Sequence, residues 1–131
     1  MAIATEAIKR LEITGSVASI SIVNIHGFEI ARLVMDGAKP VSANVALMKA
    51  KQAAALGKLT SETRDEIEEG KKTPALLGIQ PDCVVPWAGG VPIYDEEGNL
   101  LGGLGISNLT EDEDEDAAEN AVVSAGFLYE K

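Results

Sequence analysis

The chain has 131 residues, of which 46% are hydrophobic and 24% charged, and its formal net charge is −10 at pH 7. This length and composition are typical of one folded domain, so we expect residues 1–131 to form a single domain. The negative charge argues against a nucleic-acid partner, because phosphate binding needs a basic surface.

The N-terminal segment and the cysteine content bear on location. MAIATEAIKRLEIT lacks the basic start and apolar run of a secretory signal. No apolar stretch reaches the roughly 20 residues of a membrane span. The single cysteine, Cys83, fits a reducing compartment. We therefore expect a cytoplasmic protein with no membrane partner.

The first predicted elements are a helix and a hairpin. The apolar residues of segment 2–13 recur at helical spacing, which predicts a short amphipathic helix. Residues 16–37 hold two β-rich runs around the turn NIHG, which ends at Gly27 and is typical of a β-hairpin. Asp36-Gly37 and Pro40 end the second strand.

Two helices are expected next. Ser42 can cap a helix that ends at Gly57, and Lys49 falls outside its predicted apolar stripe. That stripe consists of Ala46, Leu47, Ala50, Ala53 and Ala54. A more polar helix is predicted over 61–69, and the following residues 71–82 form a loop with a short helical turn.

The last predicted elements are strands and a helix. Segments 83–94 and 100–107 are expected to be strands around the turn DEEGN. Thr110 and Glu113 form a capping box at the start of the terminal helix. The order of elements predicts an α+β fold, in which helices pack on an antiparallel sheet of four or five strands.

Glycines are concentrated in segment 89–107, which holds six of the thirteen in the chain. In the last strand Gly103 and Gly105 point to the same face, which leaves a bare trough. Such a trough could receive a packed helix, a second copy of the chain or a flat ligand. Spacing alone favours the helix.

Three side chains are candidates for chemistry. His26 is the single histidine, and it is either an exposed turn residue or a ligand for haem iron or an acid–base group. A lone histidine cannot build a zinc site. Arg32 is either a surface cation or a carboxylate-binding group. Cys83 is interpreted as a small buried hydrophobic residue.

Four segments carry a family resemblance. In chain order they are SISIVNIHGFEIARLVMDGA, LMKAKQAAA, VVPWAGGVPI, and GGLGIS followed by Thr110 and Asp114. Together they resemble the GlcG/HbpS-like family, a haem-binding domain also found at the C-terminus of PduO-type corrinoid adenosyltransferases. At the hairpin tip, where the family usually has Asp-x-Gly-Gly, this chain has Asn24-Ile25-His26-Gly27.

The resemblance implies a profilin-like or PAS-like sheet with packed helices and assembly into dimers, tetramers or octamers. It also implies that the glycine strands line a pocket or a subunit contact. The expected site is where the hairpin tip, the Lys49 helix and the Gly-Gly-x-Pro segment converge. Its candidate residues are Asn24, His26, Gly27, Arg32, Lys49, Gly89, Gly90 and Pro92.

Three functions remain open at this point, one of which is an accessory or assembly protein with no chemistry of its own. The first is an oligomeric protein that binds haem or a related flat or anionic molecule, with His26 as the candidate metal ligand. The alternative is a small accessory enzyme of a catabolic operon, acting on a small carboxylate or carbonyl compound. A competing account of the candidate residues assigns the glycines to packing and Lys49 to the helix surface.

Overall fold

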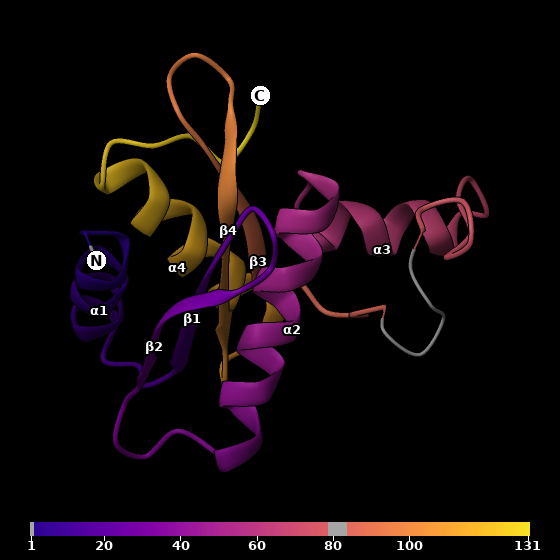
Figure 1. Ribbon diagram of the computed structural model, residues 1–131. Coiled ribbons are helices and arrows are strands. Elements are labelled where there is room, and N and C mark those ends of the chain that lie inside the picture. Colours follow the sequence, from indigo (N-terminus) through magenta and orange to yellow (C-terminus); the bar gives the residue numbers. More distant parts are fainter. Residues whose placement is uncertain (1, 79–83) are drawn as a thin grey trace.

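A computed structural model describes residues 2–78 and 84–131 of the chain. Its helices and strands are shown in Figure 1. In chain order they are α1 (Ala2–Thr14), β1 (Ser19–Asn24), β2 (Glu29–Val34), α2 (Pro40–Leu56), α3 (Thr60–Glu68), β3 (Gly90–Tyr94), β4 (Leu100–Ser107) and α4 (Glu111–Ser124). Among these residues, no helix has the length and apolar character needed to cross a membrane.

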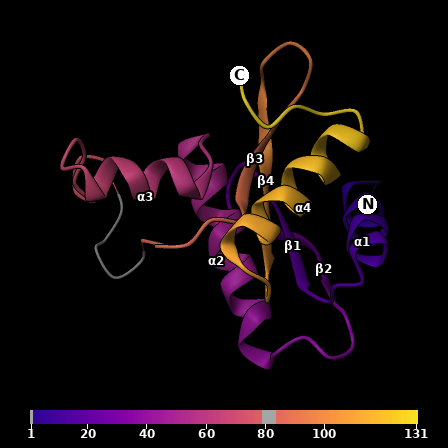
Figure 2. The same ribbon diagram turned by 180° about the vertical axis from the view of Figure 1, so that it is seen from behind.

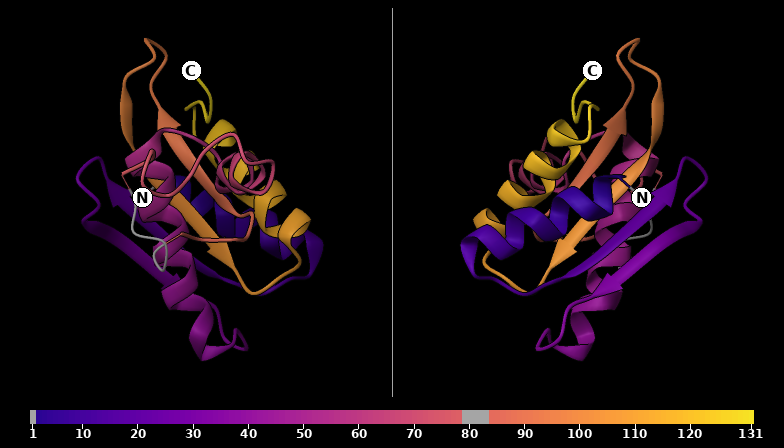
Figure 3. Two further views of the ribbon diagram at one scale, coloured as in Figure 1. Left: turned by 90° about the vertical axis from the view of Figure 1, so that its right-hand side faces the viewer. Right: turned by 90° about the vertical axis from the view of Figure 1, so that its left-hand side faces the viewer.

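The strands form one antiparallel sheet in the order β2-β1-β4-β3. Helix α2 covers one face of this sheet, whereas α1 and α4 lie side by side on the other (Figures 1 and 2). The two side views in Figure 3 show the same layers, with α2 in front of the sheet in one and behind it in the other. The predicted α+β class with an antiparallel sheet and packed helices is confirmed.

The face toward α1 and α4 holds the larger apolar core. Because side chains alternate along a strand, every second residue of the central strands points into it. Its buried members from the sheet are Ile20, Ile22, Val91, Ile93, Leu104 and Ile106, and those from the helices include Ile3, Ala7, Leu11, Ala118, Ala121 and Val122.

The face toward α2 is built from glycines instead. A Cβ atom added to Gly105 would lie 2.0 Å from the Ala46 carbonyl oxygen, and one added to Gly103 would lie 2.2 Å from the Ala50 carbonyl oxygen. The backbone of α2 therefore lies directly on the sheet. A helix of the same chain fills the glycine trough, so the expectation that these glycines line a ligand pocket or a subunit contact is wrong.

Helices α2 and α4 are stabilised in different ways at their N-terminal ends. Helix α2 begins at Pro40, two residues before the predicted cap, because proline at the first position has a suitable φ and needs no backbone N–H there. The Ser42 hydroxyl donates to the Lys39 carbonyl at 2.6 Å and does not cap the helix. Helix α4 has the predicted capping box, in which Thr110 and Glu113 bond reciprocally.

The predicted strand over 83–94 is shorter in the structure. Strand β3 begins at Gly90, and residues 84–89 are not strand. Pro86 has no N–H for a sheet ladder, and Gly89 has φ +120°, which is outside the strand region. The interpretation of Cys83 falls on a residue outside the described ranges.

We expect Gly105→Ala to lower the free energy of unfolding by about 3 kcal/mol or more, because the new Cβ collides with helix backbone that has no room to move. Gly70→Ala is the control. Its φ of +76° adds strain of about 1–2 kcal/mol, but no atom lies within 4 Å of the added Cβ. Urea denaturation measures the free energy of unfolding of both variants. Equal losses of stability in the two would contradict the close packing of α2 on the sheet.

Candidate functional site

The β1–β2 turn is shaped by two of the candidate residues. The Asn24 side-chain oxygen accepts hydrogen bonds from the backbone N–H groups of His26 at 2.9 Å and Phe28 at 3.1 Å. Gly27 has φ +83°, a left-handed conformation that glycine adopts without strain. Asn24 and Gly27 therefore hold the hairpin tip in shape.

His26 projects from this turn into solvent. Two neighbouring apolar side chains are also exposed, Ile25 by 48% and Phe28 by 70%. A recess of about 280 Å³ lies between the tip and the second half of α2, where Lys51 lines it. The tip thus presents an imidazole, apolar surface and a cation together.

Arg32 lies on the edge strand β2 and is already paired. Its Nε atom is 3.0 Å from the carboxylate oxygens of Glu29, and the Ser21 hydroxyl donates to the same carboxylate at 2.6 Å. Partial burial opposes ionisation of Glu29, but the Ser21 hydrogen bond and the Arg32 charge together lower its pKa. The charge of Arg32 is therefore largely matched within β2.

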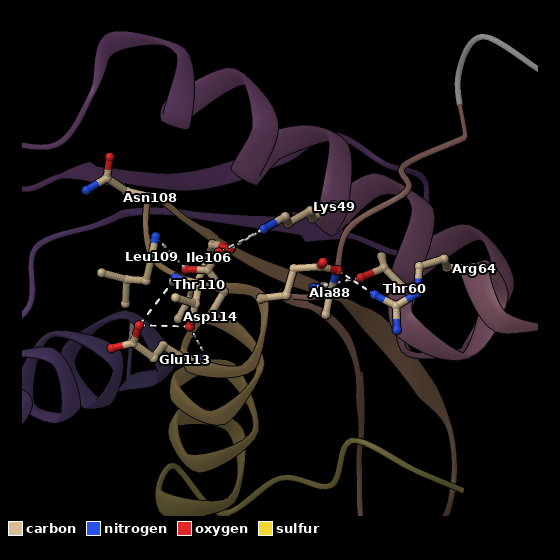
Figure 4. A network of polar contacts seen from close by, with 12 residues as sticks. Lys49, Thr60, Arg64, Ala88, Ile106, Asn108, Leu109, Thr110, Glu113 and Asp114 are labelled. Carbon is tan, nitrogen blue, oxygen red and sulfur yellow. Dashed lines mark hydrogen bonds and ion pairs between the residues drawn. The ribbon is translucent and has the colours of Figure 1, made fainter.

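Lys49 is buried, so its predicted place outside the apolar stripe is wrong. Its side chain is only 2% exposed, and its Nζ atom donates to the Ile106 carbonyl at 2.9 Å and to the Asp114 carboxylate at 3.1 Å (Figure 4). The physical reason is its spacing. Lys49 follows Ala46 by three residues and precedes Ala53 by four, so all three lie on the face that packs on the sheet.

The partner of Lys49 is Asp114, in the first turn of α4. Its other carboxylate oxygen accepts the Leu109 backbone N–H at 3.2 Å. Burial raises the pKa of the Asp114 carboxyl, and the positive charge of Lys49 partly offsets this rise. Burial also lowers the pKa of the Lys49 ammonium, and the negative charge of Asp114 partly offsets this fall. The result is a desolvated ion pair that joins α2 to α4 across the end of β4.

The Gly-Gly-x-Pro segment packs around Lys49. A Cβ atom added to Gly89 would lie 2.8 Å from the Lys49 Nζ atom, and one added to Gly90 would lie 2.6 Å from the Lys49 carbonyl oxygen. Pro92 is buried in the edge strand β3, opposite Gly103. These glycines leave room for the lysine and its helix.

The sequence-predicted residues therefore form two groups. Lys49 lies with Gly89 and Gly90, whereas the hairpin tip lies further along the sheet. The register shows this separation, because Asn24 pairs with Gly102 of β4 and Gly90 pairs with Gly105. The tip meets α2 beside Lys51, not Lys49.

A pocket of about 260 Å³ opens beside the ion pair, and Lys49 is the one member of its lining that the sequence analysis named as a site residue. The residues that it missed include Trp87, Ser107 and Asp114. Asp114 could have been found. It precedes Ala117 by three residues and Ala118 by four, which places a carboxylate on the buried face of a helix. Trp87 and Ser107 have no such signal, because only the fold brings them beside α2.

Metal-binding groups are sparse in ranges 2–78 and 84–131. No group of three or more His, Cys, Asp or Glu side chains in these ranges could hold a metal ion. A metal at His26 would therefore have to be one whose remaining ligands come from a cofactor or from another molecule.

Comparison with known proteins gives concordant matches. The sequence model of the family described as "Haem degrading protein HbpS-like" matches residues 1–123. The corrinoid adenosyltransferase PduO of Salmonella typhimurium is 35% identical over 108 residues, which are 80% of this chain but only 31% of PduO. The chain thus spans about a third of the length of that relative.

Solved structures agree with the family match. The crystal structure of a PduOC:heme complex superposes with a TM-score of 0.87 at 29% identity, covering 98% of this chain and 93% of that one. A double mutant of HbpS from Streptomyces reticuli superposes with a TM-score of 0.81 at 25% identity, covering 94% and 81% respectively.

The buried ion pair yields a stability prediction. Lys49→Met leaves the Asp114 carboxylate buried without a cation, so we expect a loss of about 3–5 kcal/mol in the free energy of unfolding. In Lys49→Met/Asp114→Asn the uncompensated charge is absent and an acceptor for the Leu109 N–H is kept, so the double variant should lose less than Lys49→Met alone. Urea denaturation of the single and double variants measures the coupling, and strictly additive losses would refute it.

Proposed function

This chain belongs to the HbpS-like family, and from that premise we propose that it is an oligomeric protein that binds haem at the β1–β2 hairpin tip, with His26 as the iron ligand. Haem enters the proposal from the family description and from the PduOC:heme complex, which is a structural relative of this chain. The observation that supports this site is the position of the single histidine, His26, which is exposed at an apolar hairpin tip beside Lys51.

The side chains at the tip fit the chemistry of haem. Imidazole is a common axial ligand of haem iron. The exposed Ile25 and Phe28 offer apolar surface to the macrocycle, and the Lys51 ammonium can pair with a propionate carboxylate. Asn24 fixes the backbone at His26, so the imidazole is carried by an ordered turn.

The size of the recess supports the oligomeric part of the proposal. At about 280 Å³ the space beside His26 is below the roughly 300–1,000 Å³ of typical small-molecule pockets, so one chain covers only part of a haem. Ile30 and Leu101, which are 63% and 42% exposed, line a separate recess with Ile3 and Phe127 on the face of α1. The exposed side chains beside His26 are Ile25 and Phe28, and a second copy packed on them would exclude water from the rest of the ligand.

When bound, haem supplies a redox-active iron. The residues of this chain have separate roles around it. A ring nitrogen of His26 would bind the iron, Lys51 would pair with a propionate, and Ile25 and Phe28 would keep water from the macrocycle.

We expect titration of the apo-protein with hemin to give a saturable Soret band, which His26→Ala shifts or abolishes because the chain has no second imidazole. Lys51→Ala should keep the band and weaken affinity about two- to fivefold, as for an exposed ion pair. Arg32→Ala is the matched control, since Arg32 is paired with Glu29. An unchanged spectrum of the hemin-bound His26→Ala variant would contradict the assignment of His26 as the iron ligand.

Light scattering at micromolar concentration should show a dimer or a larger assembly. Phe28→Ser, which removes an exposed aromatic ring from the hairpin tip, should shift the equilibrium toward monomer without lowering thermal stability, because this side chain makes little contact within its own chain. A wild-type monomer with and without hemin would contradict the oligomeric part of the proposal.

A further inference from the structure

We propose that the pocket beside the Lys49–Asp114 ion pair is a second ligand site, and that it binds a small organic monocarboxylate. This inference does not rest on haem binding, because the pocket and the hairpin tip lie over different parts of α2. Lys49 and Ser42 line the pocket from the first half of the helix, whereas Lys51 meets the tip in the second half.

The first argument is an unused hydroxyl. Ser107 is the last residue of β4, lines the pocket and is only 7% exposed. It lies on the same face of the strand as Gly103 and Gly105, which is the face toward α2. Among the described residues, its hydroxyl has no hydrogen-bond partner. The oxygen is not fully enclosed by protein atoms, so it is accessible from the pocket and can form a hydrogen bond with a ligand there.

The second argument is the balance of donors and acceptors. Within the described part of the chain, the Lys49 ammonium has two acceptors, the Ile106 carbonyl and Asp114, which leaves one of its three N–H groups free. The carboxylates that line the pocket are already engaged. Asp114 accepts from Lys49 and Leu109, and Glu111 accepts from Arg64 and the Ala88 N–H. The pocket therefore offers free donors from Lys49 and Ser107. Among the carboxylate oxygens of its lining, only Glu111 Oε2 accepts no hydrogen bond from a described residue, because both donors to Glu111 reach Oε1.

The third argument is charge. Asp114 pairs with Lys49, and Glu111 shares Arg64 with Asp65. The charged residues of the lining, Lys39, Lys49, Glu111 and Asp114, balance one another, and Lys39 at the rim forms no ion pair with any described residue, so its ammonium is available to an anion. A single negative charge can pair with Lys39, whereas a multiply charged phosphate would face the two carboxylates with too few cations.

The volume and the apolar lining of the pocket indicate what the rest of the ligand is like. A volume of about 260 Å³ equals that of roughly eight or nine water molecules in the liquid, so the pocket holds a small molecule. The half-exposed Trp87 ring, Val41 and Val45 line it with apolar surface, suited to the hydrocarbon part of the ligand. The carboxylate would meet Ser107 and Lys49, and the hydrocarbon part would lie against Trp87.

The chain carries its own reporter of this site. Trp87 is the single tryptophan, so its fluorescence reports on the pocket without labelling. We expect benzoate to change the fluorescence of the apo-protein in a saturable way. Benzamide has nearly the same shape without the charge and should bind at least tenfold more weakly. Equal responses to the two compounds, or no saturation, would overturn the proposal.

Variants assign the binding to named groups. Ser107→Ala removes a hydroxyl that has no partner in the described structure, so the fold should be unaffected while benzoate affinity falls about tenfold or more. Lys39→Met should weaken benzoate about two- to fivefold, and Lys71→Met is its matched control, a 69%-exposed lysine elsewhere on the surface. Unchanged benzoate affinity in Ser107→Ala would refute the site.

His26→Ala separates this proposal from the haem assignment. It should bind benzoate as the wild type does, and Ser107→Ala should bind hemin as the wild type does. Loss of benzoate binding in His26→Ala would contradict two independent sites.

Discussion

The direct contact between the backbone of α2 and the glycines of β3 and β4 determines how the rest of this molecule is arranged. Gly90, Gly103 and Gly105 lack the side chains that would normally separate a helix from a sheet, so the carbonyl groups of α2 reach the strand backbone. The inner face of α2 must then be small, and Ala46, Ala50, Ala53 and Ala54 supply it. A chain with few aromatic residues thus gains close packing without large side chains.

This close approach also carries Lys49 into the interior. Its stem lies on the packed face of α2, so its ammonium cannot reach water and needs a partner inside the protein. Asp114 provides it from α4, on the opposite face of the sheet, and the pair meets beyond the end of β4 (Figure 4). A buried pair of this kind contributes little net stability, but it fixes α2 and α4 relative to each other. The same two side chains line the pocket.

Helix α2 therefore lines both of the proposed sites, which differ in chemistry. Its first half lines a pocket with buried donors, an ion pair and a tryptophan. Its second half lies beside the hairpin tip, where an imidazole, a cation and exposed apolar side chains suit a large flat ligand. All residues of the proposed pocket site come from one chain, whereas the proposed haem site would need further surface to cover its ligand. The rigid contact between α2 and the sheet keeps both in place.

The sequence by itself determined the elements, their order and the antiparallel sheet, because hydrophobic periodicity, glycine turns and the Thr110 capping box are local signals. It also contained the buried positions of Lys49 and Asp114 in their spacing from neighbouring alanines, although the lysine was assigned to the wrong face. Only the tertiary structure decided that α2 fills the glycine trough, that Lys49 pairs with Asp114, and that Ser107 and Trp87 share a pocket. Those contacts join residues distant along the chain, and the packing geometry that selects them leaves no local pattern in the sequence.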